Sequence, residues 1–419
     1  MTQTMVHADP TAATATTTSG KSLRERAKAL APRIAERAQA VEEMRHVHED
    51  SIAEMVEAGL TRGLQPRRYG GEEATVEDFV GAVIEISKAC TSTGWVLCIL
   101  GAHNWEMAHM SPELQDELYG DDPTTLLSSS YSTQGNKAQR VDGGFRLSGK
   151  WRSSSGVHHA HSVVLGADVP GEATHNFVVP LKDATVIDDW YTMGLAGTGS
   201  RSVVLDNVFV PEHRTLDREI LQAQAGPGLR QNTATTFRVP QALLYSSVAG
   251  APALGAGWRF YEEFPNYLGM PADRAGQFIL DNALVLSKYT EARGLLNAQE
   301  ILTLHWHREA HEYASRGEEM PVLRIAEAMY GIACGARAAV QVASSLMPAF
   351  RPSSVYSTSI VQRLYRDILV ARQHGTQDAD RAAGFMGKIQ QGVPAGHAFL
   401  MQPDTLRAAR ERAAARGWV

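Results

Sequence analysis

The stretch RVDGGFRLSGKW, residues 140–151, predicts a β-hairpin. An Asp-Gly-Gly turn joins two segments in which apolar and polar residues alternate, which is the pattern of paired, half-buried strands. Short runs rich in β-branched residues follow, each bounded by Gly, Asn, Asp or Pro: SVVLGADV, HNFVVPL and RSVVLDNVFVP. We therefore expect a small β block that begins near Leu126 and includes Pro211.

Helical patterns lie on both sides of this β block. Between Lys21 and about Tyr119, apolar residues recur every three or four positions with charged residues between them. Helices return from about Thr236, and one long run opens at Pro321, a residue suited to a first helical turn. This order predicts an α+β chain. Its expected parts are a disordered lead-in over 1–20, an N-terminal helical domain over 21–125, a β domain over 126–232, a helical bundle over 233–395 and a basic tail over 396–419.

The composition of the 419-residue chain is that of a soluble globular protein, with 44% hydrophobic and 21% charged residues. Its net charge of −6 gives no electrostatic reason to bind nucleic acid or an anionic membrane. No stretch reaches the roughly 18 consecutive apolar residues of a membrane span, and the N-terminus lacks the basic and apolar regions of a secretory signal. Three scattered cysteines favour a reducing compartment, so we expect a cytoplasmic protein.

The motifs of several common chemistries are absent from the sequence. The run GTGSRS, residues 197–202, lacks the third glycine of a dinucleotide-binding turn and leads into a strand instead of a helix. The chain also lacks a phosphate-binding Walker loop and the Gly-x-Ser-x-Gly turn of serine hydrolases. The sequence therefore gives no support for nicotinamide binding, for phosphoryl transfer from ATP or for an α/β-hydrolase.

Two groups of histidines have to be weighed as metal sites. His307 and His311 stand four apart, but no glutamate directly follows the first of them, which favours a solvated helix face. His158, His159 and His161 follow the hairpin. If the strand continued through them, His159 and His161 would share a face and His158 would point away, and no carboxylate lies nearby in the sequence. We expect neither group to bind a metal.

Four clusters combine neutral hydrogen-bonding groups with aromatic residues. They are STGWVLCILGAHNW (92–105), LSSSY (127–131), GKWRSSSG (149–156) and GLAGTGS (194–200). A planar heterocycle such as a flavin needs walls of this kind. A tryptophan can stack on its ring, hydroxyls and backbone N–H groups can meet its polar edge, and a glycine turn lets the backbone come close. Taken together, the clusters favour a cofactor pocket.

These clusters, with four further runs, resemble the acyl-CoA dehydrogenase superfamily and, more narrowly, its group D two-component flavin-dependent monooxygenases. The further runs are GLQPRRYGG, WYTMGLAGTGS, VFVPEHR and QRLYRDILVARQH, and the resemblance covers roughly residues 60 to 380. It implies a fold with an N-terminal helical domain, a small central β-barrel and a C-terminal four-helix bundle. It also implies a homotetramer.

The resemblance implies the oxygenase component of a two-component enzyme. A separate NAD(P)H:flavin reductase would supply reduced FMN or FAD, and the oxygenase would use it with O2, through a C4a-hydroperoxyflavin, to hydroxylate a small phenolic substrate. Oxygenation of nitrogen or sulfur, an acyl-CoA dehydrogenase-like reaction and a non-enzymatic flavin-binding role remain alternatives. Thr358 stands where the dehydrogenases have a catalytic carboxylate, which speaks against the dehydrogenase reaction.

The resemblance also assigns roles to individual residues. The catalytic candidates are His374, Ser154 and His103. The candidates for flavin binding are Trp151, Ser129, Ser153, Ser155, Thr198 and Ser200. The candidates for substrate binding are Trp95, His103 and Tyr131.

Helical spacing supports the role of His374 independently. Arg363, Asp367 and His374 are spaced by four and seven residues, which predicts that they share one helical face. A histidine with a pKa near 6.5 can take a phenolic proton near neutral pH. A structural ion pair followed by a histidine at the helix end is the alternative.

Overall fold

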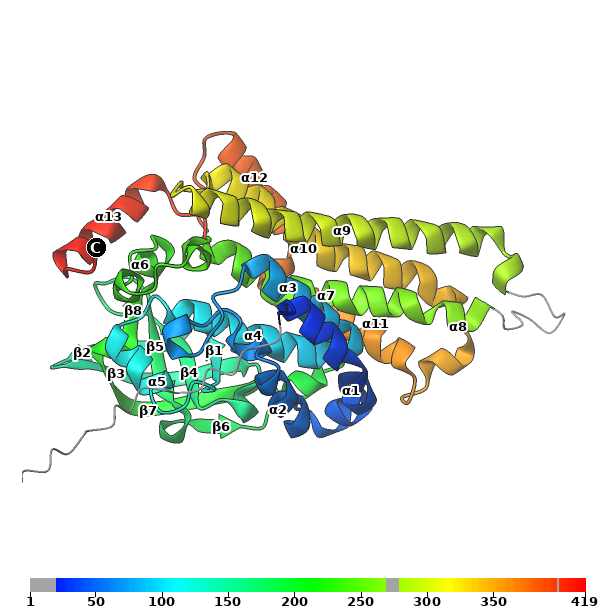
Figure 1. Ribbon diagram of the computed structural model, residues 1–419, viewed down its shortest axis with the longest axis horizontal. Coiled ribbons are helices and arrows are strands. Elements are labelled where there is room, and N and C mark those ends of the chain that lie inside the picture. The colour runs from blue at the N-terminus through cyan, green and yellow to red at the C-terminus, as the bar shows by residue number, and fades with distance from the viewer. Residues whose placement is uncertain (1–19, 269–278, 398) are drawn as a thin grey trace, which may run out of the picture.

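The computed structural model describes residues 20–268, 279–397 and 399–419, so the expected lead-in lies, apart from Gly20, outside the described residues. Three blocks follow one another along the chain (Figure 1). Helices form the first block, strands the second and long helices the third, which confirms the predicted α+β fold.

The N-terminal block is helical. It contains α1 (Leu23–Met44), α2 (Glu49–Glu57), α3 (Val76–Ala89), α4 (Thr91–Met107) and α5 (Pro112–Tyr119). A capping box starts α1: the Ser22 hydroxyl accepts from the Glu25 N–H, and the Glu25 carboxylate accepts from the Ser22 N–H. Almost every residue of α4 is buried, because apolar and small residues lie all around this helix. It therefore runs through the centre of the molecule, in contact with α3 and α7.

The β block consists of two four-stranded sheets. Its strands are β1 (Leu127–Ser130), β2 (Lys137–Val141), β3 (Gly144–Ser154), β4 (Ser162–Ala167), β5 (His175–Pro180), β6 (Thr185–Ile187), β7 (Arg201–Pro211) and β8 (Thr215–Asp217). One sheet has the order β1-β4-β5-β8 and the other β2-β3-β7-β6. Neighbouring strands are antiparallel except β1 and β4, which are parallel.

Strands β2 and β3 confirm the predicted hairpin, since Val141 pairs with Gly144 across the turn. The expected closed barrel is wrong for the described strands, which form two open sheets. The two sheets instead share one apolar core that contains Phe145 and Trp151 from β3 and Phe177 from β5. The strands β6 and β8, three residues each, end their sheets and are too short to continue the pairing around a ring.

The C-terminal block is again helical. It contains α7 (Gln241–Glu263), α8 (Pro265–Leu268), α9 (Ala283–Ser315), α10 (Val322–Leu346), α11 (Ile360–Ala371), α12 (Ala379–Gln390) and α13 (Pro403–Ala415), while α6 (Arg218–Gln222) links it to the sheets. Helix α7 contacts α9, α10 and α11 on one side and α3 and α4 on the other, and α9, α10 and α7 run alongside one another (Figure 1). Within the described ranges, no helix combines the length and hydropathy needed to cross a membrane.

Candidate active site

A cavity of about 550 Å³ lies where the β block meets α4, α7 and the segment after α11. Nine of the eleven residues predicted for the site line it: Trp95, His103, Ser129, Tyr131, Ser153, Ser155, Thr198, Ser200 and His374. The walls also contain apolar side chains (Ile99, Leu195, Val248, Val370, Phe399) and polar or aromatic ones that sequence analysis did not assign (Ser130, Arg152, Trp190, Tyr245, Gln373, Thr376). The structure thus brings residues from three blocks of the chain together around one space.

Helix α4 supplies one long wall of the cavity. Trp95, Ile99 and His103 recur every four residues and therefore lie on one face of the helix. At 1.5 Å per residue, Trp95 and His103 are about 12 Å apart along the helix axis. The cavity accordingly has two ends, one beside Trp95 and a buried one beside His103.

Trp151 and Ser154, two of the predicted site residues, do not line the cavity. The Trp151 ring lies fully buried between the sheets, where its Nε1 donates to the Gly166 carbonyl oxygen at 2.7 Å. The Ser154 side chain is also fully buried, and its hydroxyl has no hydrogen-bond partner among the described residues. The register of β3 against β7 shifts between Trp151 and Ser154, so that Ser153 and Ser155 face the cavity instead.

A chain of hydrogen bonds connects four side chains in the cavity wall. The Thr198 hydroxyl donates to the Leu195 carbonyl oxygen at 2.8 Å. Ser200 lies 2.7 Å from Thr198 and Ser155 lies 2.7 Å from Ser200, so each of these serines donates to the next hydroxyl along the chain. Trp95 Nε1 donates to Ser155 Oγ at 3.1 Å. Every hydroxyl hydrogen is used within the chain, and the oxygens keep a lone pair each for a bound group.

His374 lies at the cavity but not on the helix predicted for it. Helix α11 ends at Ala371, and His374 begins a short turn, Gly375–Gln377, so the shared face with Arg363 and Asp367 is wrong. Its Nδ1 lies 2.9 Å from Thr376 Oγ1, and its ring meets the Trp95 ring edge-on at 5.6 Å. His374 is exposed where it borders the cavity. Nearby protein still disfavours the charged imidazole, and this desolvation lowers the pKa of His374 to about 4.

Asp367 holds the cavity wall in place. Its side chain is buried, and its Oδ1 accepts from the Leu195 N–H at 2.6 Å, which ties α11 to the turn before β7. Burial raises the pKa of Asp367 to about 6. Arg363 turns away toward α1 and donates to Gln39 Oε1 at 2.7 Å. The hydrogen bonds of Asp367 and Arg363 go to Leu195 and Gln39, and that of His374 goes to Thr376. The alternative expectation, an ion pair on α11 next to the histidine, therefore does not explain the position of His374.

A carboxylate that sequence analysis missed lies behind the buried end of the cavity, in contact with Tyr131 and Tyr245 of its wall. Glu106 on α4 is fully buried and accepts from the hydroxyls of Tyr131 and Tyr245, while Asn176 Nδ2 donates to its other oxygen at 2.5 Å. His103 Nδ1 lies 3.2 Å from the Tyr131 hydroxyl. The available signal was that Glu106, three residues after His103, is the one carboxylate of this buried helix.

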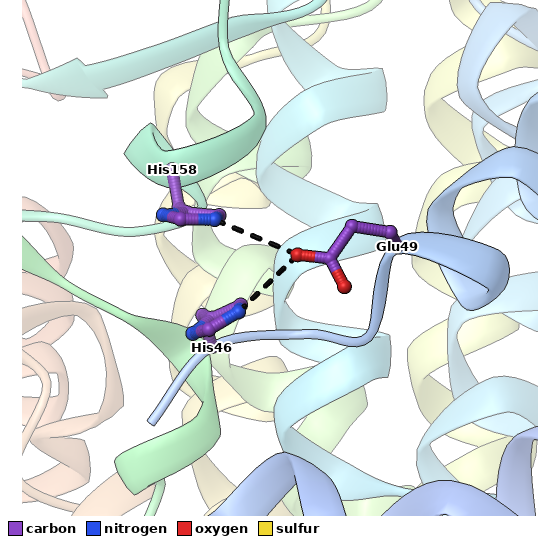
Figure 2. Close-up of side chains that lie close together, drawn as sticks. All are labelled: His46, Glu49 and His158. Carbon is purple, nitrogen blue, oxygen red and sulfur yellow. Dashed lines mark ion pairs between the residues drawn. The ribbon is translucent and has the colours of Figure 1, made fainter. Parts of the chain in front are cut away.

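His158 belongs to a different cluster, in a short turn (Val157–His159) rather than a strand. Figure 2 shows that His158 and His46 both face Glu49, with Nε2–Oε1 distances of 3.6 and 3.3 Å. The three ligand atoms lie within 4.8 Å of one another. Arg201 Nη1, however, lies 3.3 Å from His158 Nδ1 and can only donate to it, so that His158 Nε2 carries the hydrogen. The cluster therefore fits a hydrogen-bonded group, with a neutral His158 donating to Glu49, better than a metal site.

His307 does not lie on a solvated helix face, which makes that expectation wrong. Its side chain is fully buried between α9 and α7, and its Nε2 lies 2.7 Å from Ser247 Oγ. Burial lowers the pKa of His307 to about 3. This histidine is a hydrogen-bonded part of the helix packing.

Comparison with known proteins extends over most of the chain. Family models of the acyl-CoA dehydrogenase N-terminal and C-terminal domains match residues 17–118 and 247–378. The chain is 33% identical to the flavin-dependent monooxygenase, oxygenase subunit HsaA, of Rhodococcus jostii (strain RHA1), over 88% of this chain and 98% of that protein. It is 30% identical to the p-hydroxyphenylacetate 3-hydroxylase, oxygenase component, of Acinetobacter baumannii, over 90% of each. The crystal structure of 3-HSA hydroxylase from Rhodococcus sp. RHA1 is similar, with 31% identity, a TM-score of 0.86 and coverage of 91% and 99%.

Proposed function

The chain belongs to the acyl-CoA dehydrogenase family, among the oxygenase components of flavin-dependent monooxygenases, and on that premise we propose that it hydroxylates a small phenol. In such a reaction one oxygen atom of O2 enters the aromatic ring and the other leaves as water, with both electrons drawn from reduced flavin. The observation that carries the proposal is the meeting of Trp95, a chain of hydroxyls, His103 and His374 in one cavity. Two relatives are named as hydroxylases of p-hydroxyphenylacetate and of resorcinol, and both of those compounds are phenols.

The residues of the cavity fit a flavin ring. The hydroxyls of Ser129 and Ser153 line the cavity and, among the described residues, make no hydrogen bond with protein. Ser200 and Thr198 add lone pairs from the polarised chain, which suit the N–H groups of a reduced flavin. We propose that these four side chains hold FMN or FAD. When bound, the flavin supplies the electrons and activates dioxygen.

His374 is the residue we propose to act on the substrate hydroxyl. Because its pKa is lowered to about 4, the ring is neutral at pH 7 and can accept a proton. The Thr376 backbone N–H, 3.4 Å from Nδ1, favours the tautomer with the hydrogen on Nε2. The Thr376 hydroxyl can accept from Nδ1 instead, and that tautomer gives Nε2 the lone pair that the proposed role requires. Val370 and Leu195 add apolar surface to the cavity wall.

The name of oxygenase subunit or component implies a separate flavin reductase, and we propose that this chain receives its reduced flavin from such a partner.

We also propose the domain limits 21–125, 126–232 and 233–395, with a tail over 396–419, and that α7, α9, α10 and α11 form the four-helix bundle. The three free cysteines support a cytoplasmic location.

The test is an assay of the purified protein with NADH, a flavin reductase, FMN or FAD, and a panel of phenols, aryl amines and aryl thioethers. A ring-hydroxylated product that depends on the reductase supports the proposal. Products from the amines or thioethers alone would replace it with oxygenation of nitrogen or sulfur. Rapid NADH oxidation without the reductase would contradict the two-component mechanism.

His374→Ala tests the assigned base. Hydroxylation at pH 7 should fall by about 10²- to 10⁴-fold, the usual contribution of a positioned general base. The defect should shrink at high pH, where a phenol ionises unaided near a pKa of about 10. Wild-type activity should fall as the pH drops through about 4, because the His374 ring is then protonated. Full hydroxylation by the variant at pH 7, measured as single-turnover product yield, would show that His374 is structural.

A further inference from the structure

At the buried end of the cavity, the hydroxyls of Tyr131 and Tyr245 lie within hydrogen-bonding distance of each other and of His103 Nδ1. The Tyr131 and Tyr245 hydroxyls lie 2.9 Å apart, and both also hydrogen-bond to Glu106 Oε2. His103 Nδ1 lies 3.2 Å from the Tyr131 hydroxyl and 3.5 Å from that of Tyr245. His103 Nε2, by contrast, is buried and has no partner among the described residues, although the side chain lines the cavity.

The charge of Glu106 decides where the hydrogens of this group lie. An ionised carboxylate only accepts, so both tyrosine hydroxyls donate to it and have no hydrogen left for His103. Nδ1 of His103 must then carry its own hydrogen and donate to the Tyr131 oxygen. A neutral histidine has one ring hydrogen, so Nε2 is left with a lone pair directed at the cavity. If Glu106 were protonated, a tyrosine could donate to Nδ1, and Nε2 would carry the hydrogen instead.

The surroundings of Glu106 suit the ionised form. Asn176 Nδ2 donates to Oε1, and the Asn176 carbonyl accepts from Arg218 Nε at 2.6 Å, which places the guanidinium charge one amide away from the carboxylate. Arg218 Nη2 also donates to the Tyr131 backbone carbonyl at 2.9 Å. Every group that touches the Glu106 oxygens can therefore donate to them, and a cation compensates the buried charge.

We propose that Glu106 is a positioning residue that fixes the ring tautomer of His103 through Tyr131 and Tyr245, so that the buried end of the cavity selects substrates carrying an O–H or N–H donor in addition to the hydroxyl on which His374 acts. The proposal rests on the proposed function in one respect, that this cavity is the substrate site. It adds to that function a rule of specificity, because an aromatic compound whose only group at this end is a carbonyl or an ether would face the lone pair of Nε2. Such a contact leaves both acceptors unsatisfied, which weakens binding.

The direct test is the protonation of His103 Nε2 in the full-length protein. Nitrogen-15 NMR of histidine-labelled protein, sedimented for magic-angle spinning, separates protonated from unprotonated ring nitrogens, and His103→Gln identifies the signals. The wild type should show an unprotonated Nε2 at pH 7. In Glu106→Gln the amide oxygen can still accept from Asn176, and its NH2 group then donates to the tyrosines. The tyrosine hydroxyls are thereby released to donate to His103 Nδ1, and Nε2 should become protonated.

A wild-type pH titration gives the same readout without any substitution. The charged and titratable groups that face Glu106 are His103, Tyr131, Tyr245 and Arg218. Burial raises the pKa of Glu106, and burial lowers the pKa of His103 to about 3. Lowering the pH should therefore move the single ring hydrogen from Nδ1 to Nε2 before the ring takes up a second one. Loss of the neutral ring in one step, with no exchange of the hydrogen, would overturn the proposal.

Ligand binding tests the specificity rule with resorcinol and 3-methoxyphenol, which both keep one hydroxyl for His374, measured by calorimetry on the flavin-free protein. Wild type should bind resorcinol about tenfold more tightly, the effect of one hydrogen bond, and Glu106→Gln should lose that preference. Glu263→Gln, another buried glutamate but one paired with Arg259 on α7, is the matched control and should change neither result. Equal weakening of both ligands in Glu106→Gln would indicate a structural role only. Neither the NMR signal nor the binding measurement needs turnover. The proposal for Glu106 can therefore fail while the hydroxylase function is confirmed, and the hydroxylase function can fail while the proposal for Glu106 is confirmed.

Discussion

Ser153 shows how a single backbone angle places three consecutive serines. Its φ of 63° lies in the left-handed region, which is unfavourable for a residue with a side chain, and it coincides with the register shift of β3 against β7. Regular alternation from the buried Trp151 would have placed Ser153 and Ser155 on the interior side of the strand and Ser154 on the opposite side. The local irregularity leaves Ser155 in the hydrogen-bonded wall and Ser154 unpartnered in the interior.

Substitution of these two serines should separate cofactor chemistry from folding. Ser155→Ala breaks the link between Trp95 and Ser200, so we expect more hydrogen peroxide released per NADH and less hydroxylated product, by about tenfold for one lost hydrogen bond. Ser154→Ala removes a buried hydroxyl without a partner and should leave product yield and unfolding temperature nearly unchanged. The measurement is the ratio of product to peroxide. Equal losses in both variants would contradict the assignment.

Asp367 should make stability depend on pH. Its pKa is about 6 in the folded protein and ordinarily 3.8, so the fold favours the protonated carboxyl. The contribution of Asp367 to the free energy of unfolding is complete below pH 3.8 and is lost as the pH rises through about 6. The difference between the two pKa values corresponds to about 3 kcal/mol. Asp367→Asn keeps an oxygen for the Leu195 N–H, so its melting temperature relative to wild type should rise between pH 4 and 7. A constant difference would show that Asp367 keeps its ordinary pKa.

At the scale of elements, the turn between β6 and β7 joins the sheets to three helices. Gly194 lies so close to α11 that an added Cβ would be 2.5 Å from the Arg366 carbonyl oxygen. At Gly197 a Cβ would be 2.3 Å from Val41 Cγ1 of α1 and 3.1 Å from Ser92 Cβ of α4. The glycines of GLAGTGS are therefore required by close packing, which in turn holds Thr198 and Ser200 in the cavity wall.

Gly197→Ala should test this close packing. The clash with Val41 forces α1 or the turn to move, and overpacking of this kind costs about 1–3 kcal/mol. Gly294→Ala on the exposed face of α9, where no atom lies within 4 Å of the new Cβ, is the control and should stabilise the helix by about 1 kcal/mol. Thermal unfolding and flavin affinity measure both variants. If Gly197→Ala behaved like the control, the turn would not be tightly packed in solution.

At the scale of the whole molecule, all three blocks contribute to the cavity, so no block alone contains the site. The chain leaves several large apolar side chains exposed, among them Tyr191 at 72% and Tyr356 at 68%. These features support the proposal that the protein assembles with copies of itself.

We expect a homotetramer. Sedimentation equilibrium should give a mass of about four times the 45.6 kDa of one chain, at concentrations where the enzyme is active. Tyr356→Glu places a charge on an exposed apolar position and should lower the mass if that position lies in an interface, whereas Ser357→Glu beside it gives a comparison of equal charge. A mass near one chain for the wild type would contradict the proposal.

Local periodicity and turn chemistry were enough to predict the order of the blocks and the hairpin. The resemblance to the family, carried by motifs whose residues stand close together in the chain, supplied nine of the residues that surround the cavity. Three features became visible in the folded chain alone: which serines face the cavity, where α11 ends before His374, and the contacts of Glu106 with Tyr131, Tyr245 and Asn176. Folding also brought Glu49 to His158, across more than a hundred residues of chain. Such contacts depend on strand register and on the packing of distant elements, and no short window of sequence specifies either.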